Sequence, residues 1–178
     1  PTSAQIKNFF RVVRKFAPDP IRFQLAYGLM LYLGLRKTEV SELQWEHIDL
    51  ERKELFVHSN GARTDKLPLP SLLNDLLIQL QSNQQSDYVF KDNNHTNPSI
   101  EFYEYYKLFS SIADWNFPGG LHLLRHTFIT RVSLHPDMTP VLLMRLARHK
   151  RPETTSIYLH RSPAFLKNAI NKIQSIGD

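Results

Sequence analysis

The segment from Ile21 to Leu33 limits the possible folds more than any other part of the chain, because it is apolar almost all the way round. A helix without a polar face has to be covered by other elements on every side. Pro18 and Pro20 mark its start, and Gly34 predicts its end. The sequence therefore predicts a buried central helix around which the rest of the domain packs.

Helical periodicity of apolar residues recurs over most of the chain. An amphipathic helix from Ser3 to Phe16, capped by Thr2 or Ser3, is predicted ahead of the central one. The later helices are predicted over residues 36–43, 72–80, 99–114 and 121–134, and after Pro140, Pro152 and Pro163. The chain is thus expected to be mostly helical.

Two short strands are predicted at Leu55–Val57 and Lys66–Leu69, because the Asn60-Gly61 pair between them is a strong hairpin signal. Tyr88–Phe90 is predicted to be a third strand or an extended stretch. A length of 178 residues suits one domain. The predicted fold class is therefore mainly α with a small antiparallel β-sheet (α+β), in a single domain over residues 1–178.

The charge balance is basic, with 22 Lys and Arg against 17 Asp and Glu and a formal net charge of +5. A domain that neutralises phosphates carries such an excess, although many ordinary proteins are equally basic. On the first helix, one face carries Lys7, Arg11, Arg14 and Lys15. We expect this face to be solvated, and a phosphate-facing stripe is the alternative.

The chain has no cysteine, which excludes a disulfide scaffold, a four-cysteine zinc site and thiol catalysis. No apolar run approaches the length of about 20 residues that a membrane span needs. The sequence therefore predicts a protein without a membrane partner and with an intracellular, cytoplasmic location.

Three separated segments, 34–39, 122–127 and 148–158, concentrate groups suited to one reaction. Transfer of a DNA phosphodiester to a protein hydroxyl places growing negative charge on the phosphate oxygens. Planar, permanently charged arginines bind such oxygens better than lysine does. Imidazoles donate hydrogen bonds or move protons near neutral pH, and a tyrosine beside guanidinium groups becomes a competent nucleophile.

These motifs resemble those of the tyrosine recombinases, or phage integrase family. Gly-Leu-Arg-x-x-Glu at 34–39 is followed by His-x-x-Arg-His at 122–126, and then by His149 with Tyr158 nine residues later. The resemblance covers essentially the whole chain. It implies the tyrosine recombinase catalytic-domain fold and a site-specific recombinase or integrase that cleaves and rejoins DNA through a 3′-phosphotyrosine. It further implies double-stranded DNA as partner, a homotetramer on DNA, no cofactor, no metal, and an N-terminal core-binding domain outside this chain.

Position by position, the resemblance implies Tyr158 as nucleophile, Arg36 and Arg125 as phosphate-binding arginines, and His122 and His149 as supporting histidines. Glu39 matches an acidic residue with a positioning role. The residues expected to touch DNA around this site are Arg63, Arg148, Lys150 and Arg151.

The sequence departs from the family pattern at three places. Asn60 stands where the family has a lysine that protonates the leaving 5′-oxygen, and Asn cannot act as an acid. Either Lys66 or Arg63 substitutes from a shifted register, or protonation of the leaving group is impaired, and we prefer Lys66. Leu123 replaces an acidic residue, and Arg148 replaces a glycine, where it either strains the turn or adds a phosphate contact.

Other functions compete with this hypothesis. The three departures suit a DNA-binding regulator on a weakened recombinase scaffold, and a type IB topoisomerase-like enzyme shares the chemistry. His122 and His126 lie four apart and suggest a metal pair, which the absence of an obvious third ligand in the sequence disfavours.

Overall fold

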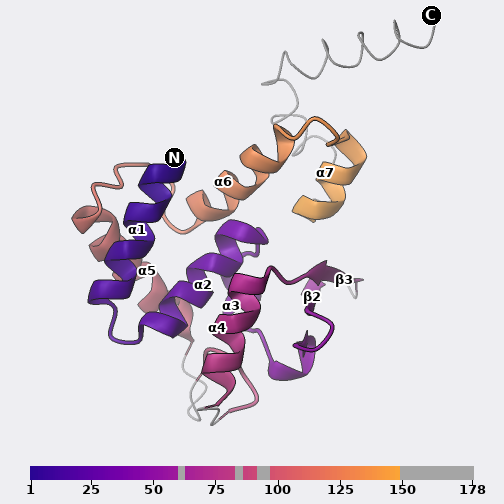
Figure 1. Cartoon of the computed structure of the whole chain (residues 1–178), viewed down its shortest axis with the longest axis horizontal. Helices are drawn as coiled ribbons and strands as arrows, with labels where there is room; N and C mark the ends of the chain where they lie inside the picture. The colour runs from indigo at the N-terminus through magenta and orange to yellow at the C-terminus, as the bar shows by residue number, and fades with distance from the viewer. Residues whose placement is uncertain (60–62, 83–85, 92–96, 149–178) are drawn as a thin grey trace, which may run out of the picture. The chain divides into compact units, whose positions relative to one another are not determined.

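The computed structural model describes residues 1–59, 63–82, 86–91 and 97–148. The chain separates into two compact units, Pro1–His126 and Thr127–Asp178, which we call the first and second units. Figure 1 labels the main elements of both. Those of the first unit are α1 (Ser3–Phe16), α2 (Pro20–Tyr32), α3 (Lys37–Ser41), the 3-10 turn η1 (Trp45–His47), β1 (Ile48–Asp49), β2 (Glu54–Ser59), β3 (Arg63–Pro68), α4 (Ser71–Gln81) and α5 (Pro98–Ile112). Helix α6 (His122–Ser133) begins in the first unit and ends in the second, which also holds α7 (Pro140–Ala147).

The central helix predicted from the sequence is α2, and it is buried along most of its length. Asp19 caps its N-terminus by accepting a hydrogen bond from the Arg22 backbone N–H, and Pro20 occupies the first turn. Helices α1, α3 and α4 pack on it. Gly28 allows α4 to approach closely, because a Cβ at this position would lie 2.7 Å from Leu73 Cδ2.

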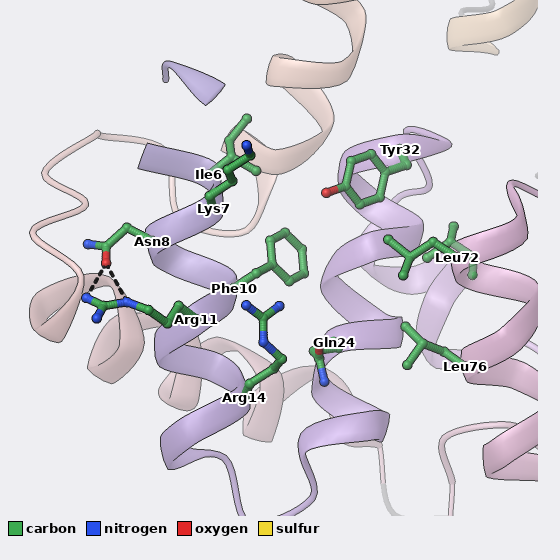
Figure 2. Close-up of a pocket in the computed structure, with 11 residues that line it drawn as sticks. Ile6, Lys7, Asn8, Phe10, Arg11, Arg14, Gln24, Tyr32, Leu72 and Leu76 are labelled. Carbon is green, nitrogen blue, oxygen red and sulfur yellow. Dashed lines mark hydrogen bonds between the residues drawn. The ribbon is translucent and has the colours of Figure 1, made fainter. Parts of the chain in front are cut away.

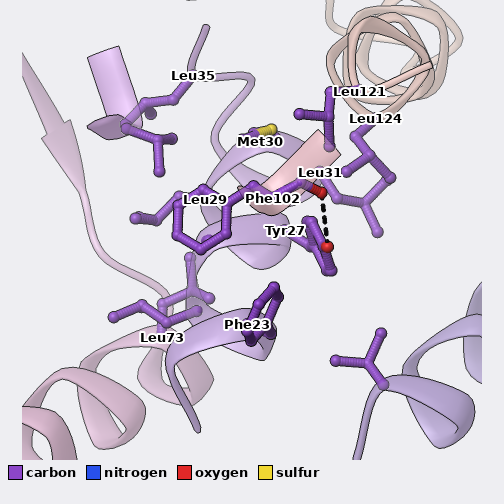
Figure 3. Packing of buried hydrophobic residues seen from close by; sticks show 14 of the residues in the cluster. Phe23, Tyr27, Leu29, Met30, Leu31, Leu35, Leu73, Phe102, Leu121 and Leu124 are labelled. Atoms are coloured by element: carbon purple, nitrogen blue, oxygen red, sulfur yellow. Dashed lines mark hydrogen bonds between the residues drawn. The ribbon is translucent and has the colours of Figure 1, made fainter. Parts of the chain in front are cut away.

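Aromatic rings fill the space between α1, α2 and α5. The Phe9 ring lies 5.6 Å from those of Tyr27 and Tyr106 and 5.0 Å from that of Trp115, centroid to centroid. The phenol of Tyr27 is fully buried and donates a hydrogen bond of 2.9 Å to the Phe102 carbonyl, so no polar group is stranded there (Figure 3). This core fixes α2, and with it the loop that follows α2.

A three-stranded antiparallel sheet in the order β1-β2-β3 completes the first unit. Leu55 pairs with Leu67 and faces the core, while Phe56 pairs with Lys66 on the opposite face. The third strand is Ile48–Asp49 and not Tyr88–Phe90, so that alternative of the prediction was wrong. Tyr88 makes only an isolated bridge to Gln44.

The reason lies in how the segment around Tyr88 is bonded. The Trp45 N–H donates to the Asp87 carbonyl, and the Val89 N–H donates to the Leu43 carbonyl. These two hydrogen bonds hold the segment against the loop after α3. The residues on both sides of Tyr88 are bends, so the extended stretch, the other form of the prediction, is not found either.

The second unit has a small apolar cluster of its own, formed by Ile129, Met138, Leu143 and Ala147. Thr139 caps α7 by accepting a hydrogen bond from the Leu142 backbone N–H. The helices predicted after Pro152 and Pro163, and the hairpin turn at Asn60-Gly61, lie outside the described residues.

The fold is mostly helical with a small antiparallel sheet, as predicted from the sequence. That residues 1–178 form a single domain stays a prediction. In the part of the chain that the structure describes, no helix is both long and apolar enough to cross a bilayer.

Candidate active site

Arg36 lies at the N-cap of α3, directly after the loop that ends α2. Its backbone is extended, with ψ of 153°, so the helix begins one residue later than predicted. Glu39, one turn along, accepts hydrogen bonds from the Arg36 backbone N–H (2.7 Å) and from its guanidinium (2.6 Å). The carboxylate is nearly buried, whereas the Arg36 side chain is 35% exposed. Glu39 therefore orients the guanidinium while leaving it accessible, which fits the positioning role expected of it.

Arg125 comes from α6, far along the chain, and is only 7% exposed. Its guanidinium donates a hydrogen bond to the backbone carbonyl of Gly34. Gly34 has a φ of +64°, a conformation that glycine adopts without strain. The buried arginine is thereby fixed to the loop that carries Arg36, and the first two sequence motifs meet.

His122 lies one turn before Arg125 on α6. Partial burial lowers the pKa of its imidazole below the ordinary value of 6.5. The positive charges that lower this pKa further belong to Lys37, His126, Arg125 and Arg36. Charges act in this way only from nearby, so the imidazole lies among the cationic groups of both motifs.

This group of side chains, Arg36, Arg125 and His122, is called the cationic cluster below. Two guanidinium groups supply permanent positive charge, and a mostly neutral imidazole supplies a hydrogen-bond donor near pH 7. Such an arrangement can bind the non-bridging oxygens of a phosphodiester and stabilise charge that grows on them.

Lys37 was missed by the sequence reasoning, although it stands next to Arg36 in the first motif. It is exposed and close enough to His122 to lower the pKa of that imidazole. The signal available in the sequence was its place in the first turn of α3.

Lys66 lies on β3, on the face of the sheet turned away from Leu55 and Leu67. Its ammonium nitrogen is 2.7 Å from a carboxylate oxygen of Glu54, and its side chain is 56% exposed. Arg63 begins the same strand. The structure thus places Lys66 in an ion pair on the hairpin, and its role in the reaction stays a prediction.

Arg148 ends α7 in the left-handed region, with φ of 51° and ψ of 42°. This is the conformation that glycine favours at a helix C-terminus, so the expectation of a strained turn is met. The residue is 6% exposed, and its guanidinium donates to the Leu146 carbonyl at 3.4 Å. A contact from this buried side chain to DNA stays a prediction.

The remaining predicted site residues, His149, Lys150, Arg151 and Tyr158, lie outside the described residues. The structure therefore brings together Arg36, Arg125 and His122 from the predicted site, whereas His149 and the predicted nucleophile are not described. Within residues 1–59, 63–82, 86–91 and 97–148, no three or more His, Asp or Glu side chains are grouped so as to hold a metal ion, at His122 and His126 or elsewhere.

With this geometry established, comparison with known proteins assigns the chain to a family. The family model described as "Phage integrase family" matches residues 2–164. The chain belongs to the phage integrase family. The resemblance drawn from the motifs is thereby confirmed.

Relatives of this phage integrase family member include tyrosine recombinase XerC of Lacticaseibacillus casei (strain BL23). XerC is 27% identical over 182 residues, which cover 95% of the chain and 60% of XerC. The chain thus spans about 60% of the length of the curated relatives it matches.

Two solved structures share the fold of this family member. The XerH recombinase bound to its difH substrate has a TM-score of 0.80 at 18% identity, over 96% of this chain and 53% of XerH. The catalytic domain of bacteriophage HP1 integrase has a TM-score of 0.72 at 19% identity, over 96% of this chain and 92% of that domain. The tyrosine recombinase catalytic-domain fold predicted from the sequence is therefore confirmed.

Proposed function

We propose that the chain is the catalytic domain of a site-specific DNA recombinase, which cleaves and rejoins DNA strands through a 3′-phosphotyrosine. The observation that carries this proposal is the cationic cluster, in which Arg36, Arg125 and His122 come together from two distant segments. Membership of the phage integrase family and the likeness to tyrosine recombinases support it.

In the proposed reaction the two guanidinium groups bind the non-bridging oxygens of the scissile phosphate. The hydroxyl of Tyr158 loses its proton to solvent as its oxygen attacks phosphorus, and the bond from phosphorus to the 5′-oxygen breaks. His122 and His149 donate hydrogen bonds to the phosphate as its charge grows. Because the phosphotyrosine conserves the bond energy, a 5′-hydroxyl can reverse the step and rejoin a strand without a nucleotide cofactor.

The leaving 5′-oxygen needs a proton, and we propose Lys66 as its donor. An ammonium group has the required proton and a flexible stem. In the unbound protein this group is paired with Glu54, so DNA binding has to exchange the carboxylate for the oxygen.

Double-stranded DNA is the proposed partner, and XerH, which shares the fold, has been solved bound to its difH substrate. The net charge of +5 favours such a partner. Arg63, Arg148, Lys150 and Arg151 are proposed to contact the duplex around the site. We further propose that the active assembly on DNA is a homotetramer and that the protein works inside the cell.

A second candidate function is a DNA-binding protein with weakened catalysis. The ion pair between Lys66 and Glu54 favours it, because an ammonium group that is bound to a carboxylate is not directed at the leaving group. Asn60, at the position where the family lysine is expected, points in the same direction.

A nicked suicide substrate, from which the short cleaved strand diffuses away, separates the two functions. For a recombinase, the wild-type chain should form a covalent protein–DNA adduct that survives denaturing electrophoresis, and Tyr158→Phe should form none. If the wild type shifts DNA on a native gel yet leaves no adduct, the chain is a binder and the proposed function is wrong.

A further inference from the structure

A groove with a volume of about 490 Å³ lies in the first unit between α1 and α4, above α2. Figure 2 shows Phe10 and Ile6 on α1, Tyr32 at the end of α2, and Leu72 and Leu76 extending from α4 toward the same space. None of these residues belongs to the cationic cluster. The groove is therefore separate from the site that we assign to DNA cleavage.

The walls of the groove are apolar and incompletely covered. Leu72 is 59% exposed and Tyr32 is 37% exposed, although both extend from elements that pack in the core. The rings of Phe10 and Tyr32 stack at 6.0 Å, which gives the groove a flat aromatic surface at one end. Leu72 and Tyr32 therefore leave apolar surface uncovered along the opening of the groove.

One rim is strongly basic. Lys7, Arg11 and Arg14 line the groove from α1 at a spacing of four and three residues, so they share one side of the helix. Arg11 is oriented by Asn8, whose side-chain oxygen accepts from its Nη2 at 2.7 Å and its Nε at 3.2 Å. Among the described residues, no carboxylate forms an ion pair with any of these three cations. The opposite wall, on α4, contributes only leucines: Leu72, Leu73 and Leu76.

We propose that this groove binds an amphipathic helix of a partner protein, with acidic residues along the flank that faces α1. The space between two neighbouring helices accepts the apolar stripe of a third. Because the positive charge lies on one rim alone, the charge pattern fixes which flank of the bound helix is acidic. From the sequence, we expected the α1 face that carries Lys7, Arg11, Arg14 and Lys15 to be solvated. The first three of these cations line the groove, so that expectation holds for only part of the face.

Two other occupants fit the groove less well. A DNA backbone would pair with the cations and leave Leu72 and Tyr32 exposed to water. Among the described helices of a second copy, α5 exposes Ile100 and Leu108, and α7 exposes Val141 and Leu142. The two carboxylates of α5, however, are already paired, Glu101 with Arg22 and Glu104 with Lys107, and α7 has no carboxylate.

The test uses the full chain and a designed, fluorescently labelled helical peptide of about 18 residues, with a leucine stripe flanked by glutamates. In the matched peptide, lysines replace the glutamates. Fluorescence anisotropy should show binding of the acidic peptide only. Arg14→Glu should weaken that binding about tenfold, with a smaller loss at high salt, and Leu72→Ser should weaken it to a similar extent.

Lys15→Glu is the control for overall charge, because Lys15 lies on the same helix and does not line the groove. It should change the peptide affinity by less than about twofold. The proposal is wrong if Lys15→Glu weakens binding as much as Arg14→Glu, or if both peptides bind equally. It is also wrong if Leu72→Ser has no effect, or if duplex DNA displaces the peptide and loses the same affinity on Arg14→Glu. Circular dichroism confirms that each variant is folded.

Discussion

The guanidinium of Arg125 donates a hydrogen bond to the carbonyl oxygen of Gly34, a residue 91 positions earlier in the chain. Gly34 lies in the loop between α2 and α3, two residues before Arg36. A single buried contact therefore joins the two motifs and relates the positions of their arginines. The proposed chemistry depends on this relationship, because one phosphate must be reached by both guanidinium groups.

Replacing Arg125 by lysine tests that relationship. Lysine keeps the charge but lacks the planar, forked donors that serve the Gly34 carbonyl and a phosphate together. We expect the rate of covalent adduct formation in Arg125→Lys to fall at least about 100-fold, with a much smaller loss of DNA affinity. Single-turnover cleavage of the suicide substrate measures the first quantity, and filter binding measures the second. Cleavage at an undiminished rate would show that Arg125 only supports the fold.

His122 predicts a pH dependence of stability. Its pKa is lowered in the folded chain, so the unfolded chain binds the proton more readily. The stability that this group contributes is complete above the ordinary value of 6.5 and is lost as pH falls from there through the lower folded pKa. Urea unfolding between about pH 7.5 and pH 5 should therefore show a weaker pH dependence in His122→Gln than in the wild type.

His47 serves as the control for this measurement. Burial and then the nearby His58 lower the pKa of His47 as well, so it contributes with the same sign from a different place. His47→Gln should remove a separate part of the pH dependence, and the double variant should remove both parts. An unchanged pH profile in His122→Gln would contradict the described surroundings of that imidazole.

Lys66 can be tested with a substrate in which sulfur replaces the bridging 5′-oxygen. A thiolate leaves without a proton, so loss of a general acid matters only on ordinary DNA. Lys66→Ala should slow cleavage of ordinary DNA about 100-fold and should cleave the sulfur substrate nearly as fast as the wild type does. Equal slowing on both substrates would assign Lys66 to binding, and no slowing on either would remove it from the site.

The left-handed conformation of Arg148 predicts an unusual order of variant stabilities. Both Arg148→Gly and Arg148→Ala lose the buried side chain, but only glycine is relaxed at a φ of 51°. Arg148→Gly should therefore be more stable than Arg148→Ala by about 1 kcal/mol in the free energy of unfolding. In an ordinary helical position the order is reversed, so an alanine variant that is the more stable one would contradict the structure.

The sequence predicted those parts of the fold that depend on local pattern. The apolar run that became α2, the cap at Thr2 and the break at Gly34 all follow from residues that are neighbours in the chain. The pairing of Tyr88 did not follow, because two backbone hydrogen bonds to the loop after α3 decide it. Backbone groups are the same at every position, so the sequence does not show which of them will meet.

The candidate site was predictable to a similar degree. Arg36, Arg125 and His122 were identified because motif spacing singles them out, but the bond from Arg125 to a backbone carbonyl leaves no trace in side-chain identity. Lys66 was predicted to be the proton donor because it carries a positive charge. The alternation of side chains along the strands, which buries Leu55 and Leu67, already placed Lys66 on the other face of the hairpin, beside Glu54.

Mapping the protein–DNA adduct identifies the nucleophile itself. After the suicide substrate is trapped, nuclease and trypsin digestion followed by mass spectrometry identifies the residue that carries the nucleotide. We predict one modified site, the phenolic oxygen of Tyr158, and a far lower yield of adduct from Arg36→Ala and Arg125→Ala. Attachment to another residue, or equal yield without the two arginines, would contradict this prediction.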